Sequence, residues 1–384
     1  QSAENLNVAV EGGTFNGDVA INGTATQTMK PGAVKVSGGT FNGNYGVFSY
    51  AEDAVAVPVI SIIGGTFASN YAEIYSYDDG FEFVFNNTTQ MYGLQEFSDL
   101  EISNLNELIA FRNAVNAGNT FKNQTVTVTA DINMESVENW TPIGTSANPF
   151  KGTFDGGNKT ISNLKVNATE TSNVGLFGVV KDGATVKNIT INNAAVKGKS
   201  NVGAIAGNLH SSTMDNCHVT GLVQIDGNYK VGGLIGTAYS KVRKSSLIAD
   251  DDSYVKGTHV EANLEGDNVG GITGYNGEGT YTYSNNTVKN VTISGTRKVG
   301  GILGFIFENA KVEGSVVENV TIESTSTSEY ANANVGKMSI GGIIGQYQKH
   351  GKSDGYVNSS FVKNVTFAKS AGLDFQVGPL VGGT

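Results

Sequence analysis

The tetrapeptide Gly-Gly-Thr-Phe decides the fold: it occurs at residues 12–15, 38–41 and 64–67, and each copy starts 26 residues after the previous one. Alternating apolar residues precede each copy, and Asn, Gly or Ser follow it, as expected for a strand, a turn and another strand. A constant period with one such unit per repeat predicts a solenoid in which every repeat forms one coil.

A second array with a longer period follows. Its signature is Val-Gly-Gly-Leu-Ile-Gly at residues 231–236, and related stretches occur on both sides of it. The closing glycines of these stretches are Gly178, Gly207, Gly236, Gly274, Gly304, Gly345 and Gly382. The shortest intervals are 29 residues, so the longer ones indicate insertions. We place these insertions near residues 250–267, 324–339 and 346–356, with a smaller one at 278–283.

A corner motif lies between the glycine clusters, with copies at residues 186–191, 288–293, 317–322 and 362–367. Apolar residues flank a central Asn, and we expect them to point inward while Lys, Glu and Thr point outward. The corner residues are then Asn188, Asn290, Asn319 and Asn364. Each also begins an Asn-x-Thr sequence, but a ladder of stacked asparagines explains the pattern better than glycosylation does.

The predicted fold class is therefore an all-β, right-handed parallel β-helix. Gly makes up 51 of 384 residues while Pro makes up only 5, and 39% of residues are apolar, enough for a narrow core along a solenoid. An apolar stripe at residues 104–117 predicts a short helix that covers the open end of the core. We expect two domains: residues 1–94 form a short array of 26-residue repeats, and residues 95–384 form a second β-helix with the helical cap and the loop insertions.

The charge of the chain excludes some partners. The net charge is −10 and the pI is near 5.0, which argues against binding nucleic acid because phosphates need clustered Lys and Arg. We find no membrane-spanning run and no signal peptide, so we expect a segment of a longer secreted protein whose anchor lies elsewhere. The sequence indicates no cofactor and no metal site, and it leaves the oligomeric state open.

From about Asn104 onward the sequence resembles the GLUG-repeat proteins, a β-helix family common on the surfaces of gut Bacteroidetes and also found beside immunoglobulin-cleaving metallopeptidases of Gram-positive bacteria. The resemblance rests on residues 106–108, 114–118, 131–132, 140–144, 150–156 and 174–178, and on the later Val-Gly-Gly-Leu-Ile-Gly copies. It implies a bacterial cell-surface location and an adhesin-like role. The companion peptidases use a His-Glu-x-x-His zinc motif, whose spacing none of the four histidines here matches, so the resemblance does not imply peptidase activity.

Aromatic residues after the closing glycines are the first candidate binding site: Tyr239, Tyr275, Phe305 and Tyr347. If they stack on one outer face, they form a ladder suited to sugar rings; the alternative is a ladder that packs on itself and shields the coil edge. The insertions are the second candidate, because additions to a solenoid project as loops. The insertion at 278–283 adds Tyr281 and Tyr283 to the candidate binding residues.

Other reactive residues have simpler interpretations. The run of three Asp at residues 250–252 lacks the alternating spacing of a calcium loop, so a solvated charge run is preferred. Cys217 falls at the inward position equivalent to Ile189, which indicates a buried, inert thiol, and His218 beside it should point outward.

The function predicted from the sequence is that of a secreted adhesin or stalk, presenting loops to a glycan or to a host or surface protein. No catalytic group stands out, so we expect no enzymatic activity. Two alternatives remain open. One is a carbohydrate-active β-helix enzyme, a polysaccharide lyase or hydrolase, and the other is a passive spacer.

Overall fold

The structure is a computed structural model of the chain, which divides into two compact units, Gln1–Ser98 and Asp99–Thr384. The structure describes residues 8–17, 19–25, 34–43, 46–51, 60–62, 64–68, 81–86, 89–96, 99–258, 268–325, 338–348, 355–369 and 375–383. Each unit is considered by itself.

The first unit repeats one coil per Gly-Gly-Thr-Phe copy. Its strands are β1 (Val8–Val10), β2 (Thr14–Phe15), β3 (Val19–Ala25), β4 (Val34–Val36), β5 (Thr40–Phe41), β6 (Gly46–Ala51), β7 (Ile60–Ile62), β8 (Thr66–Phe67), β9 (Phe81–Asn86) and β10 (Met91–Glu96). Strands one repeat apart pair in parallel, and β10 pairs antiparallel with β8 and β9. The repeated phenylalanines Phe15, Phe41 and Phe67 stack with ring centroids 4.9 and 4.8 Å apart.

The second unit begins with strand β11 (Leu100–Ile102), and the predicted helix, α1 (Leu105–Asn116), follows it. The side chain of Asn104 accepts a hydrogen bond from the Glu107 backbone N–H, and the Glu107 carboxylate accepts one from the Ser103 N–H in return, which caps the N-terminus. Leu108, Phe111 and Val115 are buried on the inner face of the helix. The prediction of a helix over 104–117 is confirmed to within one residue at each end.

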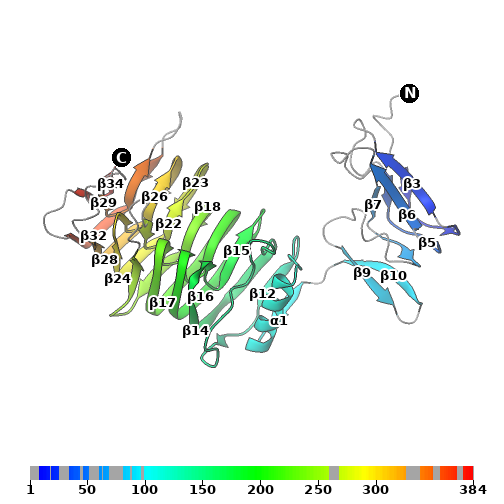
Figure 1. Ribbon diagram of the computed structural model, residues 1–384, viewed down its shortest axis with the longest axis horizontal. Coiled ribbons are helices and arrows are strands. Elements are labelled where there is room, and N and C mark those ends of the chain that lie inside the picture. The colour runs from blue at the N-terminus through cyan, green and yellow to red at the C-terminus, as the bar shows by residue number, and fades with distance from the viewer. Residues whose placement is uncertain are drawn as a thin grey trace. The chain divides into compact units, whose positions relative to one another are not determined.

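Strand β11 is the first of a long stack of parallel strands that continues after α1 (Figure 1). Its first part is β11 (Leu100–Ile102), β12 (Thr125–Val128), β13 (Ile132–Asn133), β14 (Thr153–Val174), β15 (Phe177–Lys181), β16 (Thr185–Val202), β17 (Ala206–Gly232), β18 (Ile235–Arg243), β19 (Ser246–Ala249) and β20 (Tyr254–Gly257). Its second part is β21 (Asn268–Gly270), β22 (Thr273–Asn276), β23 (Thr280–Ser284), β24 (Thr287–Gly295), β25 (Lys298–Gly300), β26 (Leu303–Phe307), β27 (Asn309–Glu313), β28 (Val316–Ser324), β29 (Met338–Gly341), β30 (Ile344–Gln348), β31 (Tyr356–Asn358), β32 (Phe361–Lys369), β33 (Phe375–Gly378) and β34 (Val381–Gly383).

Equivalent residues of successive coils stand above one another and form columns. One inward column runs Val186, Met214, Val242, Tyr283 and Val312, and all five side chains are fully buried. Burial of each aliphatic member contributes roughly 1.5–3 kcal/mol. The corner asparagines have positive φ angles, from 51° at Asn364 to 57° at Asn290, as left-handed corner residues should. The predicted all-β parallel β-helix is confirmed.

The corner motif changes its place within the coil at one point of the stack. In the early coils Val186 belongs to the column described above, and Ile191 belongs to the next one, which continues through Val219 and Leu247. Val288, the counterpart of Val186 in sequence, lies beneath Leu247 and so belongs to the column of Ile191. Strand β23, from the insertion at 278–283, fills the place that the motif has left. The motif copies are therefore equivalent in sequence but not in position.

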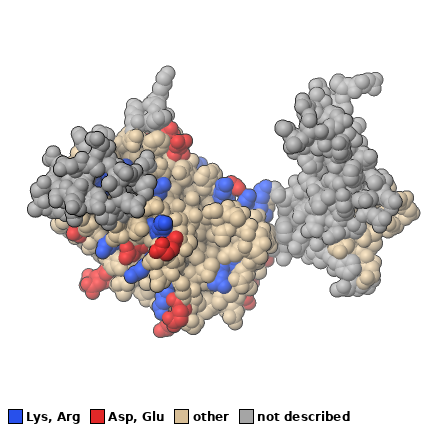
Figure 2. Space-filling model, in the orientation of Figure 1, with Lys and Arg blue, Asp and Glu red and all other residues tan. Residues whose placement is uncertain are grey.

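The surface of the second unit mixes both signs of charge. On the face shown in Figure 2, basic and acidic side chains of the described residues lie interspersed. Several pair along columns, as Lys187 does with Asp155 (3.1 Å) and Arg243 with Asp215 (3.2 Å). No helix in the described part of the chain is long and apolar enough to cross a membrane.

Candidate functional site

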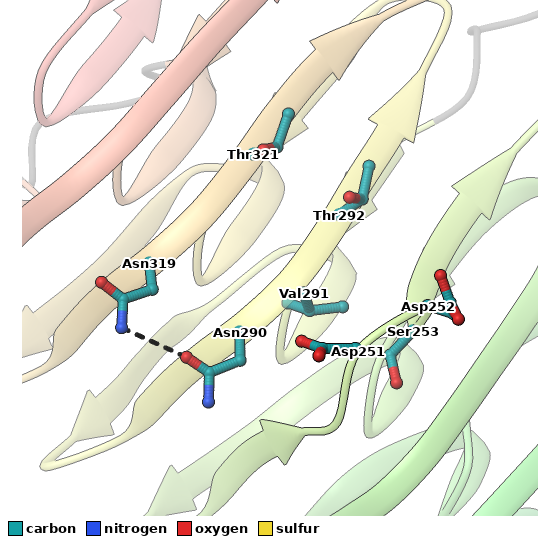
Figure 3. A pocket seen from close by; sticks show the side chains of 8 residues that line it. All are labelled: Asp251, Asp252, Ser253, Asn290, Val291, Thr292, Asn319 and Thr321. Carbon is teal, nitrogen blue, oxygen red and sulfur yellow. Dashed lines mark hydrogen bonds between the residues drawn. The ribbon is translucent and has the colours of Figure 1, made fainter.

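Two open pockets lie where the coils change register. The first, here called the tyrosine pocket, has a volume of about 380 Å³. Its lining is Gly183, Ser211, Ser212, Thr213, Tyr239, Ser240, Lys241, Thr280 and Tyr281. The second, here called the acid–amide pocket, has a volume of about 370 Å³ and is shown in Figure 3. Its lining is Asp251, Asp252, Ser253, Asn290, Val291, Thr292, Asn319 and Thr321.

Gly277, just before the insertion at 278–283, and Gly279 within it hold the rings of the tyrosine pocket in place. The Tyr239 ring, carried by β18, lies so close over Gly277 that a Cβ atom there would overlap it. Gly279 has a φ of +115°, and a Cβ atom there would lie 2.7 Å from the Tyr281 hydroxyl. The Glu308 carboxylate accepts a hydrogen bond from the Gly279 N–H (2.9 Å), which fixes this turn. The backbone at residues 277–279 thus positions both rings.

Some hydroxyl groups of the tyrosine pocket serve the fold. The Ser212 Oγ donates to the His210 carbonyl, and the Ser240 Oγ donates to the Leu209 carbonyl while it accepts from the Ser212 N–H. The hydroxyls of Thr213 and Thr280 and the ammonium group of Lys241 have no hydrogen bond or ion pair within the described ranges. These three groups are available to a ligand.

The two phenols of the pocket remain protonated donors at neutral pH. Burial raises the pKa of Tyr239, and the nearby charge of Glu278 raises it further. Burial also raises the pKa of Tyr281, helped by the charge of Glu308. A ligand would therefore meet two neutral aromatic rings with hydroxyl groups that can donate.

Tyr275 and Phe305 pack on their own surroundings instead. Their ring centroids are 5.6 Å apart, and the Tyr239 ring lies 6.4 Å from Tyr275. The Lys230 Nζ lies 4.3 Å above the Tyr275 ring, and the Lys298 Nζ lies 3.7 Å above Phe305, which is only 3% exposed. For these two residues the structure favours the self-packing alternative over a sugar-binding ladder.

Tyr283 is fully buried in the core, so its prediction as a surface binding residue is wrong, whereas Tyr347 is partly buried and stays a prediction. Tyr347 pairs with the buried Ile306 and packs against the core, and its hydroxyl accepts from the Gly355 N–H (3.0 Å). Tyr283 is fully buried below Val242, and its hydroxyl donates to the Asn276 side chain (3.2 Å). Tyr347 follows its closing glycine by two residues whereas Tyr275 and Phe305 follow theirs by one, so it lies on the other face of its strand from these two rings.

The acid–amide pocket lies at the start of the first predicted insertion. Asp251 and Asp252 are exposed on a turn that the backbone anchors on both sides. The Asp250 N–H donates to the Gly221 carbonyl in the coil before, and the Thr292 N–H donates to the Ser253 carbonyl from the coil after. Residues 259–267, 326–337 and 349–354, which hold the rest of the predicted insertions, lie outside the described residues.

Cys217 and His218 are placed as predicted. The Cys217 thiol is fully buried in the column of Ile189, and burial raises its pKa to about 12, which keeps it protonated and inert. His218 is half-buried on the outside of the coil, where Nδ1 lies 2.8 Å from the Ser246 Oγ. Burial lowers the pKa of His218. Within the described ranges, no three His, Cys, Asp or Glu side chains come together to hold a metal ion.

No family model matches the chain, so its resemblance to the GLUG-repeat proteins is not confirmed. The immunoglobulin A1 protease of Streptococcus sanguinis is 29% identical over 254 residues, which cover 63% of this chain and 12% of that protein. The immunoglobulin A1 protease of Streptococcus pneumoniae strain R6 is 27% identical over 228 residues, 54% of this chain and 10% of the protease. Halomucin of Haloquadratum walsbyi is 37% identical over 147 residues, 36% of this chain and 2% of halomucin.

Two solved structures are similar to part of the chain. One is a Bacteroides ovatus protein provisionally described as an immunoglobulin A1 protease, with 19% identity and a TM-score of 0.49 over 71% of this chain and 84% of that chain. The other, named IgA1 protease, has the same identity and TM-score over 76% of this chain and 21% of its own.

These relatives correct the expectation that the chain is not an enzyme. Proteins named as proteases match more than half of it, so the sequence gives no ground for placing the chain outside enzymes. The chain spans only 2% to 12% of the length of these curated relatives, and it lacks the His-Glu-x-x-His zinc motif. Its absence from 384 residues therefore says nothing about the activity of proteins of that size.

Proposed function

We propose that the chain is a β-helical part of a secreted bacterial surface protein of the immunoglobulin A1 protease kind, and that its tyrosine pocket binds a sugar ring of a glycan on the partner or substrate. The names of the relatives support an extracellular protease as the larger setting. Recognition of the partner, rather than scaffolding alone, is the role proposed for the β-helix.

The observation that carries this proposal is the meeting of Tyr239 and Tyr281 in one open pocket. The apolar C–H face of a sugar ring packs on an aromatic ring, and its hydroxyls need donors and acceptors around the rim. The tyrosine pocket offers both, because Thr213, Thr280 and Lys241 stand beside the two rings. A passive spacer would not need a glycine under each tyrosine to hold it in place.

A glycan array probed with the whole chain and with Tyr281→Leu tests this proposal. Leucine keeps the apolar contact of Tyr281 with the core but removes the ring face and the hydroxyl. We expect binding of the preferred glycan to fall by about tenfold or more, since loss of one stacked ring and its hydrogen bond costs at least 1.4 kcal/mol.

The matched control is Tyr356→Leu, which removes an exposed tyrosine (41% exposed) from outside the pocket. It should leave the array profile unchanged. If Tyr281→Leu binds like the parent, or if the folded parent binds no glycan, the proposed role of the tyrosine pocket is wrong.

A further inference from the structure

A row of corner residues stacks along the second unit, and two neighbouring members, Gly221 and Asp252, are not asparagine. Its members, all in the left-handed conformation, are Asn163, Asn193, Gly221, Asp252, Asn290, Asn319 and Asn364. Where asparagines are adjacent, the amide Nδ2 of each coil donates to the Oδ1 of the coil before, as in Asn193 to Asn163 (3.2 Å), Asn319 to Asn290 (3.2 Å) and Asn364 to Asn319 (3.1 Å). The corner ladder is therefore directional.

The ladder is interrupted at the acid–amide pocket. If the ladder continued, the Asn290 Nδ2 would donate to an asparagine at the corner of the coil before. That corner holds Asp252 instead. The Asn290 Nδ2 has no hydrogen-bond partner in the described part of the chain, and Asp251 and Asp252 form no ion pair there. In Figure 3 the two aspartates lie on the side of Asn290 that faces away from Asn319. The break leaves a free donor on one side of the pocket and free acceptors on the other.

The remaining lining of the pocket is neutral and polar. Thr292 and Thr321 are register partners on the outer face of β24 and β28, and their hydroxyls can donate or accept. Lys289, the nearest cation on β24, is held 2.7 Å from Glu318 and does not line the pocket. The turn that carries the aspartates is held by backbone hydrogen bonds to Gly221 and Thr292, so its backbone is fixed before a ligand arrives.

We infer that the acid–amide pocket is a second binding site, which takes the vicinal hydroxyls of a neutral saccharide in the gap of the asparagine ladder. A hydroxyl group donates and accepts at once, so it can accept from the Asn290 Nδ2 while it donates to an aspartate. Charge-assisted hydrogen bonds from hydroxyls to carboxylates are the strong ones of this set. A metal ion suits the pocket less well, because the Asn290 Oδ1 is already used by Asn319 and the free group of Asn290 is a donor.

The test follows the side-chain amide signals of Asn290 and Asn319 by NMR in the whole chain labelled with ¹⁵N-asparagine. Mannotriose, a neutral trisaccharide with vicinal hydroxyls, is the probe. We expect it to shift both signals in a saturable way, and we expect the double variant Asp251→Asn, Asp252→Asn to weaken its binding about tenfold. The variant keeps the size of both side chains, removes the two charges and replaces one acceptor oxygen of each side chain by an NH₂ donor.

Two further measurements decide the inference. Tyr281→Leu should leave the mannotriose shifts at Asn290 unchanged, which separates this site from the tyrosine pocket, so either proposal can fail without the other. The inference is overturned if mannotriose up to about 10 mM leaves both amide signals in place, a concentration that would reveal even weak sugar binding. It is equally overturned if the shifts persist in the double variant, or if Ca²⁺ moves these signals and mannotriose does not.

Discussion

The corner motifs at residues 186–191 and 288–293 differ only in having Ile189 in one copy and Val291 in the other, yet they occupy different columns of the same β-helix. Both copies keep the same inside and outside, since Ile189 and Val291 are buried and the Asn before each turns a corner. The comparison shows that the alternation of the strand fixes which side chains face the core. The chain inserted upstream fixes which neighbours they meet.

The largest expected effect is a loss of stability, and it tests whether equivalent residues of both motif copies face the core. Ile189→Asp and Val291→Asp should each lower the free energy of unfolding by about 3 kcal/mol or more, because each places an unpaired carboxylate in an apolar column. Urea denaturation of the two variants measures this. Thr190→Asp, on the outer face of the first copy, is the control and should cost less than about 1 kcal/mol. A Val291→Asp variant that unfolds like the parent would show that the second copy is turned the other way.

Tyr283 fills the column that the second copy leaves, so it is the next point to probe. Tyr283→Ala should destabilise by about 3–5 kcal/mol, since it opens a cavity between Val242 and Val312. Tyr283→Phe should cost about 1–3 kcal/mol, because the buried Asn276 side chain loses the hydrogen bond from the hydroxyl. Met214→Leu, in the same column, keeps the volume and should cost less than about 1.5 kcal/mol. Equal stability of Tyr283→Phe and the parent would mean that this hydrogen bond contributes nothing.

The corner asparagines of the two motif copies differ in their hydrogen-bond partners. Asn188 donates to Asp155 and accepts from Asn216, whereas Asn290 only accepts from Asn319. Glycine tolerates the left-handed corner, so Asn→Gly removes the side-chain bonds alone. We expect Asn188→Gly to cost about 1–2 kcal/mol and Asn290→Gly about 0.5 kcal/mol in thermal unfolding. The reverse order would contradict the interruption of the ladder at Asn290.

The sequence was sufficient for what depends on short-range pattern. Period-two alternation and the asparagine corners predict the β-helix, and the apolar stripe with the Asn104 cap predicts α1. It was insufficient for the candidate site, because a pocket depends on which coil lies over which. Tyr281 and Tyr283 are two residues apart, so the alternation of the strand does not distinguish them. Only Tyr281 lines the tyrosine pocket beside Tyr239, whereas Tyr283 is fully buried. That neighbour is set by the register of β23 against β18, which no local pattern encodes.

The register change also explains why two pockets lie near it. A regular stack places each corner beside an identical one, as the asparagine ladder does at Asn319 and Asn364. At the change, a four-residue Asp turn lies over the one-residue corner of Asn290, and β23 brings Tyr281 beside Tyr239. Unequal corners cannot pack flush, so they leave open, polar spaces on an otherwise continuous surface. An insertion in a solenoid can thus create an open pocket without a long loop.

The smallest expected effect concerns the lysine that both copies share. Lys289 lies 2.7 Å and Lys363 2.9 Å from the Glu318 carboxylate, and hydrogen bonds from these two lysines lower the pKa of Glu318 to about 2. Because the folded pKa is depressed, the stabilisation is present above the ordinary value of 4.5 and is lost as the pH falls from there towards 2. Lys187 in the first copy pairs with the single carboxylate of Asp155, whose pKa is also lowered: burial opposes the shift, and the Gly157 N–H, Asn188 and Lys187 outweigh it. An NMR titration of the side-chain carboxyl carbons should show Lys289→Met raising the pKa of Glu318 and leaving that of Asp155 unchanged. Since Glu318 is at the surface, salt should weaken this shift, and a pKa that does not respond to Lys289→Met would show that Lys363 alone sets it.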